Sequence, residues 1–181
     1  MMANWVDTRS GDRGLLLVRD ETLSDTAAVR EIVTAAFGQP GEAGLVDSIR
    51  ANGRAVISLV AEENGVVVGH ILFSPVTLEE GAARVLGLAP LSVAPEHQRR
   101  GIGGELMRAG LERARELDYN AVVLLGHPEY YPRFGFVPAA KLGLHCEYDA
   151  PVEAFMAIEL RPGGLAGARG LAKYCEDFAA L

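Results

Sequence analysis

Gln98-Arg99-Arg100-Gly101-Ile102-Gly103-Gly104 is the stretch of sequence that decides the fold. The apolar run 85–93 before it predicts a strand, and an amphipathic helix is predicted to begin at Ile102. The glycines therefore form a loop at a helix N-terminus, where backbone N–H groups are unpaired and the helix dipole is positive. Such a loop is suited to bind a phosphate or pyrophosphate. Arg99 and Arg100 add planar cations that can neutralise a diphosphate.

Length and composition indicate one globular domain, which we assign to residues 15–181 of a 181-residue chain. Residues 1–14 are polar and lack the apolar segment of a secretory signal, so we expect a mobile leader there. No apolar run reaches the roughly 20 residues that span a bilayer. Cys146 and Cys175 are too few for a disulfide framework and indicate free thiols in a reducing cytoplasm.

The charge balance points away from nucleic acid as a partner. The chain has 17 basic and 24 acidic residues, a net charge of −7, whereas nucleic-acid-binding proteins usually present a basic surface. The acidic balance mildly favours a cationic partner, such as an amine. The 4 histidines show no metal-ligand spacing, so no metal site is predicted.

The first half of the chain is predicted to form a strand, two helices and three further strands. Ser24 or Asp25 is placed to cap the first helix. Asn64-Gly65 between two strand-like runs is a strong hairpin signal. Pro90 cannot donate to a strand ladder, so it belongs at a sheet edge or a bulge. The expected elements are a strand at 15–19, helices at 28–37 and 42–51, and strands at 55–61, 66–76 and 85–93.

The break at Pro90 has a consequence for binding. It leaves backbone groups of Leu91, Ser92 and Val93 without their usual strand partner. An extended ligand that contains amides can pair with such groups as an added strand does.

The second half begins with the clearest helix of the chain. Apolar residues recur at helical spacing from Ile102 to Leu117, and charged residues occupy the other side. The run 121–125 is almost continuously apolar, as a buried parallel strand would be, so the chain makes a strand–helix–strand crossover. Further strands are predicted at 144–148 and 155–160, and a closing helix at 171–181.

Two common phosphate-binding loops do not fit the glycine stretch. A nucleotide-triphosphate P-loop needs Gly-x4-Gly-Lys-Ser/Thr, and the chain has no lysine followed by serine or threonine. A dinucleotide fingerprint needs Gly-x-Gly-x-x-Gly, which Gly101 and Gly103 begin, but Leu106 stands at the last position.

The pattern Gln/Arg-x-x-Gly-x-Gly/Ala fits residues 98–103 in full, and here the chain resembles the GNAT superfamily of acyl-coenzyme-A-dependent N-acyltransferases. Residues 91–98, Leu-Ser-Val-Ala-Pro-Glu-His-Gln, resemble that family's central strand leading into its pyrophosphate loop. Residues 130–136, Tyr-Tyr-Pro-Arg-Phe-Gly-Phe, resemble its downstream tyrosine motif. Residues 69–76 and 131–136 are similar to those of a bacterial subgroup of predicted acetyltransferases.

The resemblance implies the roles of the site residues. Backbone amides of residues 100–104 would hold the coenzyme A pyrophosphate, and glycines let the backbone approach it closely. Leu91, Ser92 and Val93 would pair with the pantetheine arm, and an N–H near Val93 would steady the oxyanion. Tyr131 stands where the family places its general acid. The donor implied is acetyl-CoA, and the expected donor-binding residues are Leu91, Ser92, Val93, Gln98, Arg99, Arg100, Gly101, Ile102, Gly103 and Gly104.

The general base is left open by the sequence. An alkylammonium has a pKa of about 10.4 and must lose a proton before it attacks. Glu62, His70, His127 and a water relay are the alternatives. His70 alternates with apolar residues as core strands do, which favours a structural role. The segment 126–129 lacks the family's Asn-x-x-Ala helical start, which removes one expected contact to coenzyme A.

The resemblance implies an α/β fold, filed as α+β in some schemes, with a mixed, largely antiparallel sheet splayed in the middle and helices on both faces. The expected activity is transfer of an acetyl group from acetyl-CoA to a primary amine, with no nucleic acid or membrane as partner. A non-catalytic acyl-CoA sensor, an O-acyltransferase and a transferase of longer acyl chains remain alternatives. The acceptor and a homodimeric state stay open, since fold does not fix substrate.

Overall fold

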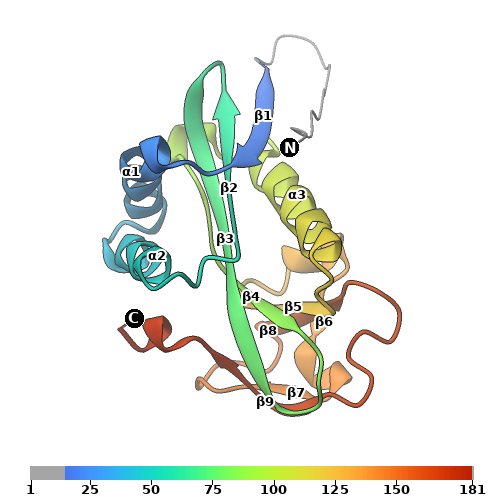
Figure 1. The fold of residues 1–181 in the computed structure, drawn as a ribbon. Helices are drawn as coiled ribbons and strands as arrows, with labels where there is room; N and C mark the ends of the chain where they lie inside the picture. The colour runs from blue at the N-terminus through green and yellow to red at the C-terminus, as the bar shows by residue number, and fades with distance from the viewer. Residues whose placement is uncertain (1–14, 181) are drawn as a thin grey trace.

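The computed structural model describes residues 15–180. Figure 1 shows a twisted sheet with α1 and α2 on one face and α3 on the other. The expected leader at residues 1–14 lies outside the described residues, and the assignment of residues 15–181 to one domain stays a prediction. The helices are α1 (Thr26–Phe37), α2 (Gly41–Ala51) and α3 (Ile102–Glu116).

The sheet has the order β1-β2-β3-β4-β5-β8-β6, and β9 joins the far end of β3 with β7 beside it. All pairs are antiparallel except β4 with β5 and β7 with β9. The predicted fold class is therefore confirmed. The strands are β1 (Leu16–Asp20), β2 (Ile57–Glu63), β3 (Val66–Glu80), β4 (Val85–Val93), β5 (Ala121–Leu125), β6 (Val137–Pro138), β7 (Leu144–Cys146), β8 (Phe155–Glu159) and β9 (Arg169–Tyr174).

The hairpin between β2 and β3 forms where the sequence predicts it. Asn64 and Gly65 both have positive φ, 52° and 83°, the geometry that a tight two-residue turn requires. Both residue types tolerate this backbone conformation, so the turn fixes the register of the two strands.

The sheet parts between β4 and β5. Their parallel pairing covers Val85 to Gly87 on β4 and ends opposite Val123. Just beyond, Ala89 and Pro90 together lie opposite Leu72 of β3, which is a β-bulge. The bulge confirms the expectation for Pro90, and the remaining length of β4 runs without β5 beside it.

The predicted closing helix at 171–181 is wrong within the described residues. Residues 169–174 form β9, which pairs antiparallel with the end of β3, and a short 3-10 turn at Glu176–Ala180 follows. In β9 the buried Ala172 and Tyr174 alternate with exposed Lys173, a period of two that indicates a strand. β3 is 15 residues long and outruns β2, so its far end offers an edge that β9 satisfies.

The two faces of the sheet each bury a hydrophobic core. One core lies under α1 and α2, and the other under α3. On the α3 side the helix lies close to the sheet at Gly110, where an added Cβ would come within 2.5 Å of the Phe73 ring. Phe73 is itself fully buried, so it has little room to move.

We expect Gly110→Ala to lower the free energy of unfolding by about 1–3 kcal/mol, because overpacking exceeds the gain in helix propensity of about 1 kcal/mol. Gly44→Ala in α2 is the matched control, since a Cβ there meets nothing within 4 Å. It should keep the propensity gain and stabilise the protein. Urea unfolding of both variants tests this, and equal effects would contradict the close approach.

Candidate functional site

Two adjoining cavities open where β4 leaves β5. The donor cavity, as we call the polar one, has a volume of about 580 Å³ and surrounds the loop before α3. The acceptor cavity is mostly apolar, has a volume of about 580 Å³, and extends along β4 to the loop after β5. Val93 and Gln98 line both, so the two form one continuous groove.

The loop folds as its glycines predict. Gly101 precedes α3 with φ of 87°, a left-handed conformation that favours glycine, and Arg99 also has positive φ. Residues 101–104 line the donor cavity together with Gln98 and Arg99. The first N–H groups of α3 have no hydrogen-bond partner within the helix. They are therefore free to donate hydrogen bonds to an anion in the donor cavity.

The cations of the donor cavity differ in part from those the sequence indicates. Arg99 lines the cavity, but Arg100 pairs with Glu63, with Nη2 2.6 Å from Oε1, and lies outside the cavity lining. Arg108 and Arg133 line it instead. Sequence reasoning missed both, although Arg108 lies one helical turn after Gly104 and Arg133 lies inside the tyrosine motif.

The strand residues predicted for donor binding all lie on the groove. Leu91, Ser92 and Val93 line the acceptor cavity along the unpaired edge of β4. Gln98 donates from its side-chain amide to the Val93 carbonyl at 3.0 Å and thereby ties the loop to the strand. Ile102 is buried in the core beneath the loop and reaches the donor cavity.

Tyr131 lines the acceptor cavity, at the start of the 3-10 turn that follows β5. Its ring meets Tyr130 edge-on at a centroid distance of 5.1 Å and Phe136 at 5.9 Å. Burial raises the pKa of Tyr131 to about 12, so the phenol stays protonated at neutral pH. A protonated hydroxyl in this place is equipped to donate a proton.

The three base candidates lie in different surroundings. Glu62 pairs with Arg19, with Oε2 2.8 Å from Nη2, and lies outside the lining of both cavities. His70 of β3 is fully buried and lies outside the lining of both cavities. Exposed His127 lines the acceptor cavity at the end of β5.

An aromatic wall in the acceptor cavity was missed by sequence reasoning. Tyr148, Tyr174 and Phe178 lie in contact, with centroid distances of 6.1 Å and 4.8 Å, and Phe37 of α1 lines the same cavity. Glu42 of α2 is the only Asp, Glu, Lys or Arg among the described residues that line this cavity. These residues come from distant parts of the chain, so their spacing in the sequence carries no common signal.

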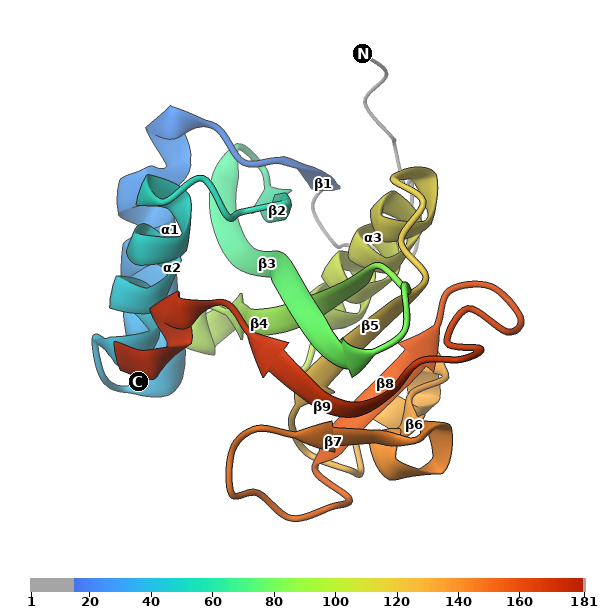
Figure 2. The same ribbon diagram turned by 60° about the horizontal axis from the view of Figure 1, so that its bottom comes forward.

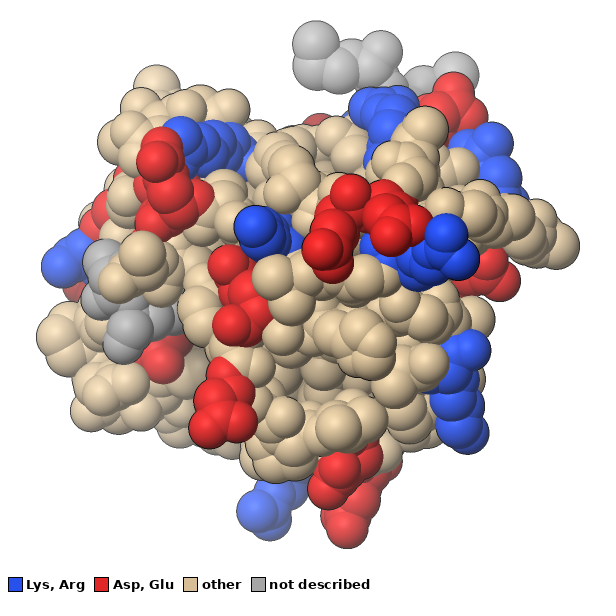
Figure 3. All heavy atoms as spheres, turned by 90° about the horizontal axis from the view of Figure 1, so that it is seen from below, with Lys and Arg blue, Asp and Glu red and all other residues tan. Residues whose placement is uncertain are grey.

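Among residues 15–180, no helix is long and apolar enough to cross a membrane, and no three His, Cys, Asp or Glu side chains cluster as metal ligands do. The face seen in Figure 3 has Lys and Arg interspersed with Asp and Glu, without a continuous basic area.

Comparisons with known proteins place the chain in a family. Residues 26–136 match the sequence model of the acetyltransferase (GNAT) family. The chain is 35% identical to the uncharacterized N-acetyltransferase YhbS of Escherichia coli K12 over 164 residues, covering 90% of this chain and 98% of YhbS. It is 43% identical over 135 residues to the uncharacterized N-acetyltransferase YjhQ of the same strain, covering 72% and 75%.

Two solved structures are similar to this one. The crystal structure of YhbS from E. coli in complex with CoA has a TM-score of 0.89 at 34% identity and covers 96% of each chain. A GNAT family acetyltransferase from Brucella melitensis in complex with acetyl-CoA has a TM-score of 0.74 at 36% identity, covering 90% of this chain and 97% of that one.

Proposed function

The chain belongs to the acetyltransferase (GNAT) family, and we propose that it transfers an acetyl group from acetyl-CoA to a primary amine. The observation that carries this proposal is the continuous groove. The glycine loop, the unpaired edge of β4 and Tyr131 line it one after another. The CoA and acetyl-CoA complexes of the YhbS and Brucella relatives support acetyl-CoA as the donor here.

The donor cavity binds the coenzyme A part of acetyl-CoA in this proposal. Backbone N–H groups of residues 101–104 bind the pyrophosphate, while Arg99, Arg108 and Arg133 neutralise its charge. The amides of the pantetheine arm pair with the free edge of β4 at residues 91–93 and bring the thioester into the acceptor cavity. A backbone N–H near Val93 stabilises the developing oxyanion.

The reaction is direct attack on the thioester. The amine nitrogen, after losing a proton, bonds to the acetyl carbon, and the carbon–sulfur bond then breaks. The thiolate takes a proton from the Tyr131 hydroxyl. The attacking nitrogen loses a second proton as it becomes an amide, and this proton returns to Tyr131 through water. Holding both reactants in one groove supplies much of the rate through orientation.

The acceptor cavity favours a cationic amine with an apolar body. The carboxylate of Glu42, held by Gln39 at 3.2 Å, attracts an ammonium. Aromatic rings bind both apolar groups and cations. The described residues lining the cavity include no Lys or Arg to repel the amine or to bind a carboxylate on the acceptor.

A thiol-release screen with acetyl-CoA against a panel of amines tests the proposed activity directly. Release with an amine, and a matching mass increase of that amine by one acetyl group, supports N-acetyl transfer. Acetylation confined to alcohols would instead identify an O-acyltransferase. Binding without any release would identify a sensor.

The free thiols of Cys146 and Cys175 accord with a reducing compartment, which we propose is the cytoplasm.

We expect Gly103→Glu to weaken acetyl-CoA binding by 100-fold or more. The new side chain places a carboxylate at the proposed pyrophosphate site, where a Cβ alone would lie 3.2 Å from the Tyr130 hydroxyl. Gly44→Glu adds the same charge in open space and is the control. Calorimetric titration with acetyl-CoA measures both, and unchanged affinity of Gly103→Glu would refute the loop assignment.

We expect Tyr131→Phe to lower kcat by about 10²- to 10⁴-fold while KM for acetyl-CoA changes little, because the ring packing stays and only the proton donor is lost. Since the pKa of Tyr131 is about 12, wild-type kcat should show no loss below pH 10 from ionisation of this phenol. Steady-state kinetics across pH 6–10 check both points. A Tyr131→Phe enzyme with wild-type kcat would remove the residue from the mechanism.

We expect Glu42→Gln to raise KM for a cationic amine about three- to tenfold without changing kcat, because a partly exposed carboxylate contributes roughly 1 kcal/mol to an ion pair. The increase should shrink at high salt. Glu31→Gln on the exposed side of α1 removes the same charge away from the groove and serves as the control. Equal KM values for the two variants would argue against Glu42 as the ammonium partner.

A further inference from the structure

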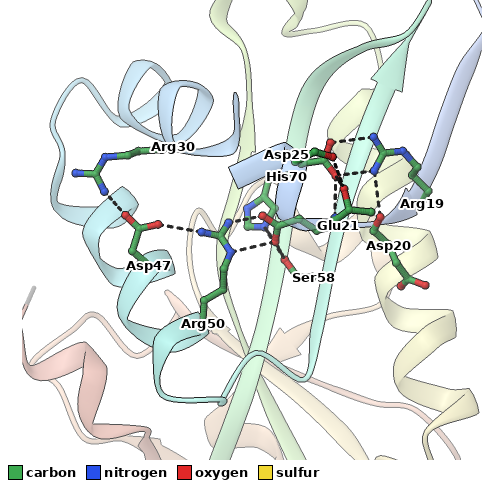
Figure 4. A network of polar contacts seen from close by, with 11 residues as sticks. Arg19, Asp20, Glu21, Asp25, Arg30, Asp47, Arg50, Ser58 and His70 are labelled. Carbon is green, nitrogen blue, oxygen red and sulfur yellow. Dashed lines mark hydrogen bonds and ion pairs between the residues drawn. The ribbon is translucent and has the colours of Figure 1, made fainter. Parts of the chain in front are cut away.

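A buried polar network links His70 and Ser58, on adjacent strands, to Arg50 of α2, as Figure 4 shows. At its centre is His70 of β3, which is 0% exposed. Its Nε2 lies 2.8 Å from the Ser58 hydroxyl and 3.5 Å from Glu21 Oε2. Glu21 in turn pairs with Arg50 of α2, which also binds Asp47.

The network fixes which nitrogen of His70 carries the proton. The pKa of Glu21 is lowered to about 2, so its carboxylate is ionised and accepts hydrogen bonds only. The Ser58 hydroxyl therefore gives its single proton to Glu21. It must then accept from His70, so Nε2 carries the hydrogen and Nδ1 has a free lone pair.

That lone pair has no hydrogen-bond partner among residues 15–180. Directly across the ladder, His70 is paired in register with Ser92 of β4, so the two side chains lie on the same face of the sheet. Within the described part of the chain, the Ser92 hydroxyl is also buried without a hydrogen-bond partner, and Ser92 lines the acceptor cavity. Two adjacent unsatisfied groups, one an acceptor and one a donor, are suited to a bridging water.

We propose that His70 receives the proton of the acceptor ammonium through Ser92 and a water, and that Glu21 and Ser58 position it for this role. This inference rests on the proposed function and names the base that the sequence leaves open. The ammonium proton passes to the Ser92 hydroxyl, the proton of that hydroxyl moves to the bridging water, and the water gives one of its protons to Nδ1 of His70. The neutral amine then attacks the thioester, and His70 later returns its proton to solvent along the same path.

The charges around His70 suit a transient proton acceptor. Burial lowers the pKa of His70, with a smaller contribution from the Arg50 charge, so the ring is neutral and ready to accept at neutral pH. The Glu21 carboxylate opposes this shift and stabilises the imidazolium when it forms. Ser58 from β2 and Ser92 from β4 are the uncharged polar groups beside it.

The test compares two acceptors in wild type, His70→Gln and Ser92→Ala. Glutamine keeps a donor for Ser58 and removes the basic nitrogen. One acceptor is a primary alkylamine whose ammonium has a pKa of about 10. The other is its fluorinated analogue, which is already deprotonated at neutral pH. With the alkylamine, kcat/KM should fall about 100-fold in His70→Gln and at least tenfold in Ser92→Ala.

With the fluorinated amine, both losses should shrink to threefold or less, because no proton needs to be removed before attack. The control is Ser74→Ala, which deletes another fully buried serine hydroxyl, from β3 and outside the lining of both cavities. The Ser74→Ala enzyme should have the wild-type kcat/KM with both amines. Thermal unfolding and acetyl-CoA binding show whether each variant remains folded.

The outcomes separate the relay from the activity it serves. Equal losses with both amines, or a Ser92→Ala enzyme indistinguishable from Ser74→Ala, would overturn the relay while the proposed function stands. If His70→Gln fails to fold, the Ser92→Ala result decides by itself. Wild-type protein that binds acetyl-CoA and acetylates neither amine would overturn the proposed function, and the relay with it.

Discussion

The parting of β4 from β5 after Gly87 is the constraint on which the rest of the structure depends. A continuous parallel ladder would satisfy the backbone of residues 88–93 within the sheet. Instead, the bulge at Ala89 and Pro90 turns β4 away and leaves one edge of the strand free. The glycine loop begins where this free edge ends, so backbone donors for an anion and for an extended amide chain lie in one groove.

The C-terminal strand closes the floor of that groove. Tyr174 of β9 packs so tightly on Gly87 that a Cβ there would come within 2.5 Å of its ring. The strand is held by the end of β3, beyond the part that pairs with β2. Figure 2 shows β9 running beside β3 toward α1 and α2, which brings Tyr174 and Phe178 to the acceptor cavity. The length of β3 thus decides which C-terminal side chains line this cavity.

Charged groups between β1 and α2 are arranged as pairs rather than left single. Arg19 binds Asp25 and Glu62, and Arg50 binds Glu21 and Asp47. A half-buried charge that lost its partner would pay a desolvation penalty without compensation, so such groups hold β1, β2 and α2 in fixed relation. The same set of contacts, through Glu21 and Ser58, gives His70 a defined tautomer. Glu62, a base candidate by sequence, is bound to Arg19 in this framework, whereas Nδ1 of His70 has no hydrogen-bond partner among the described residues.

The sequence by itself determined the features that depend on a few neighbouring residues. The Asn64-Gly65 turn, the bulge at Pro90 and the glycine loop before α3 follow from local backbone preferences, and the motifs at 98–103 and 130–136 indicated the family. Only the tertiary structure decided that residues 169–174 form a strand, that Arg108 and Arg133 rather than Arg100 line the donor cavity, and that Glu42 lines the same cavity as the aromatic wall. The physical reason is distance along the chain. A turn depends on its own φ and ψ angles, but a strand that completes a distant edge, or a cavity lined from both halves of the molecule, depends on burial and pairing that exist only once the sheet has formed.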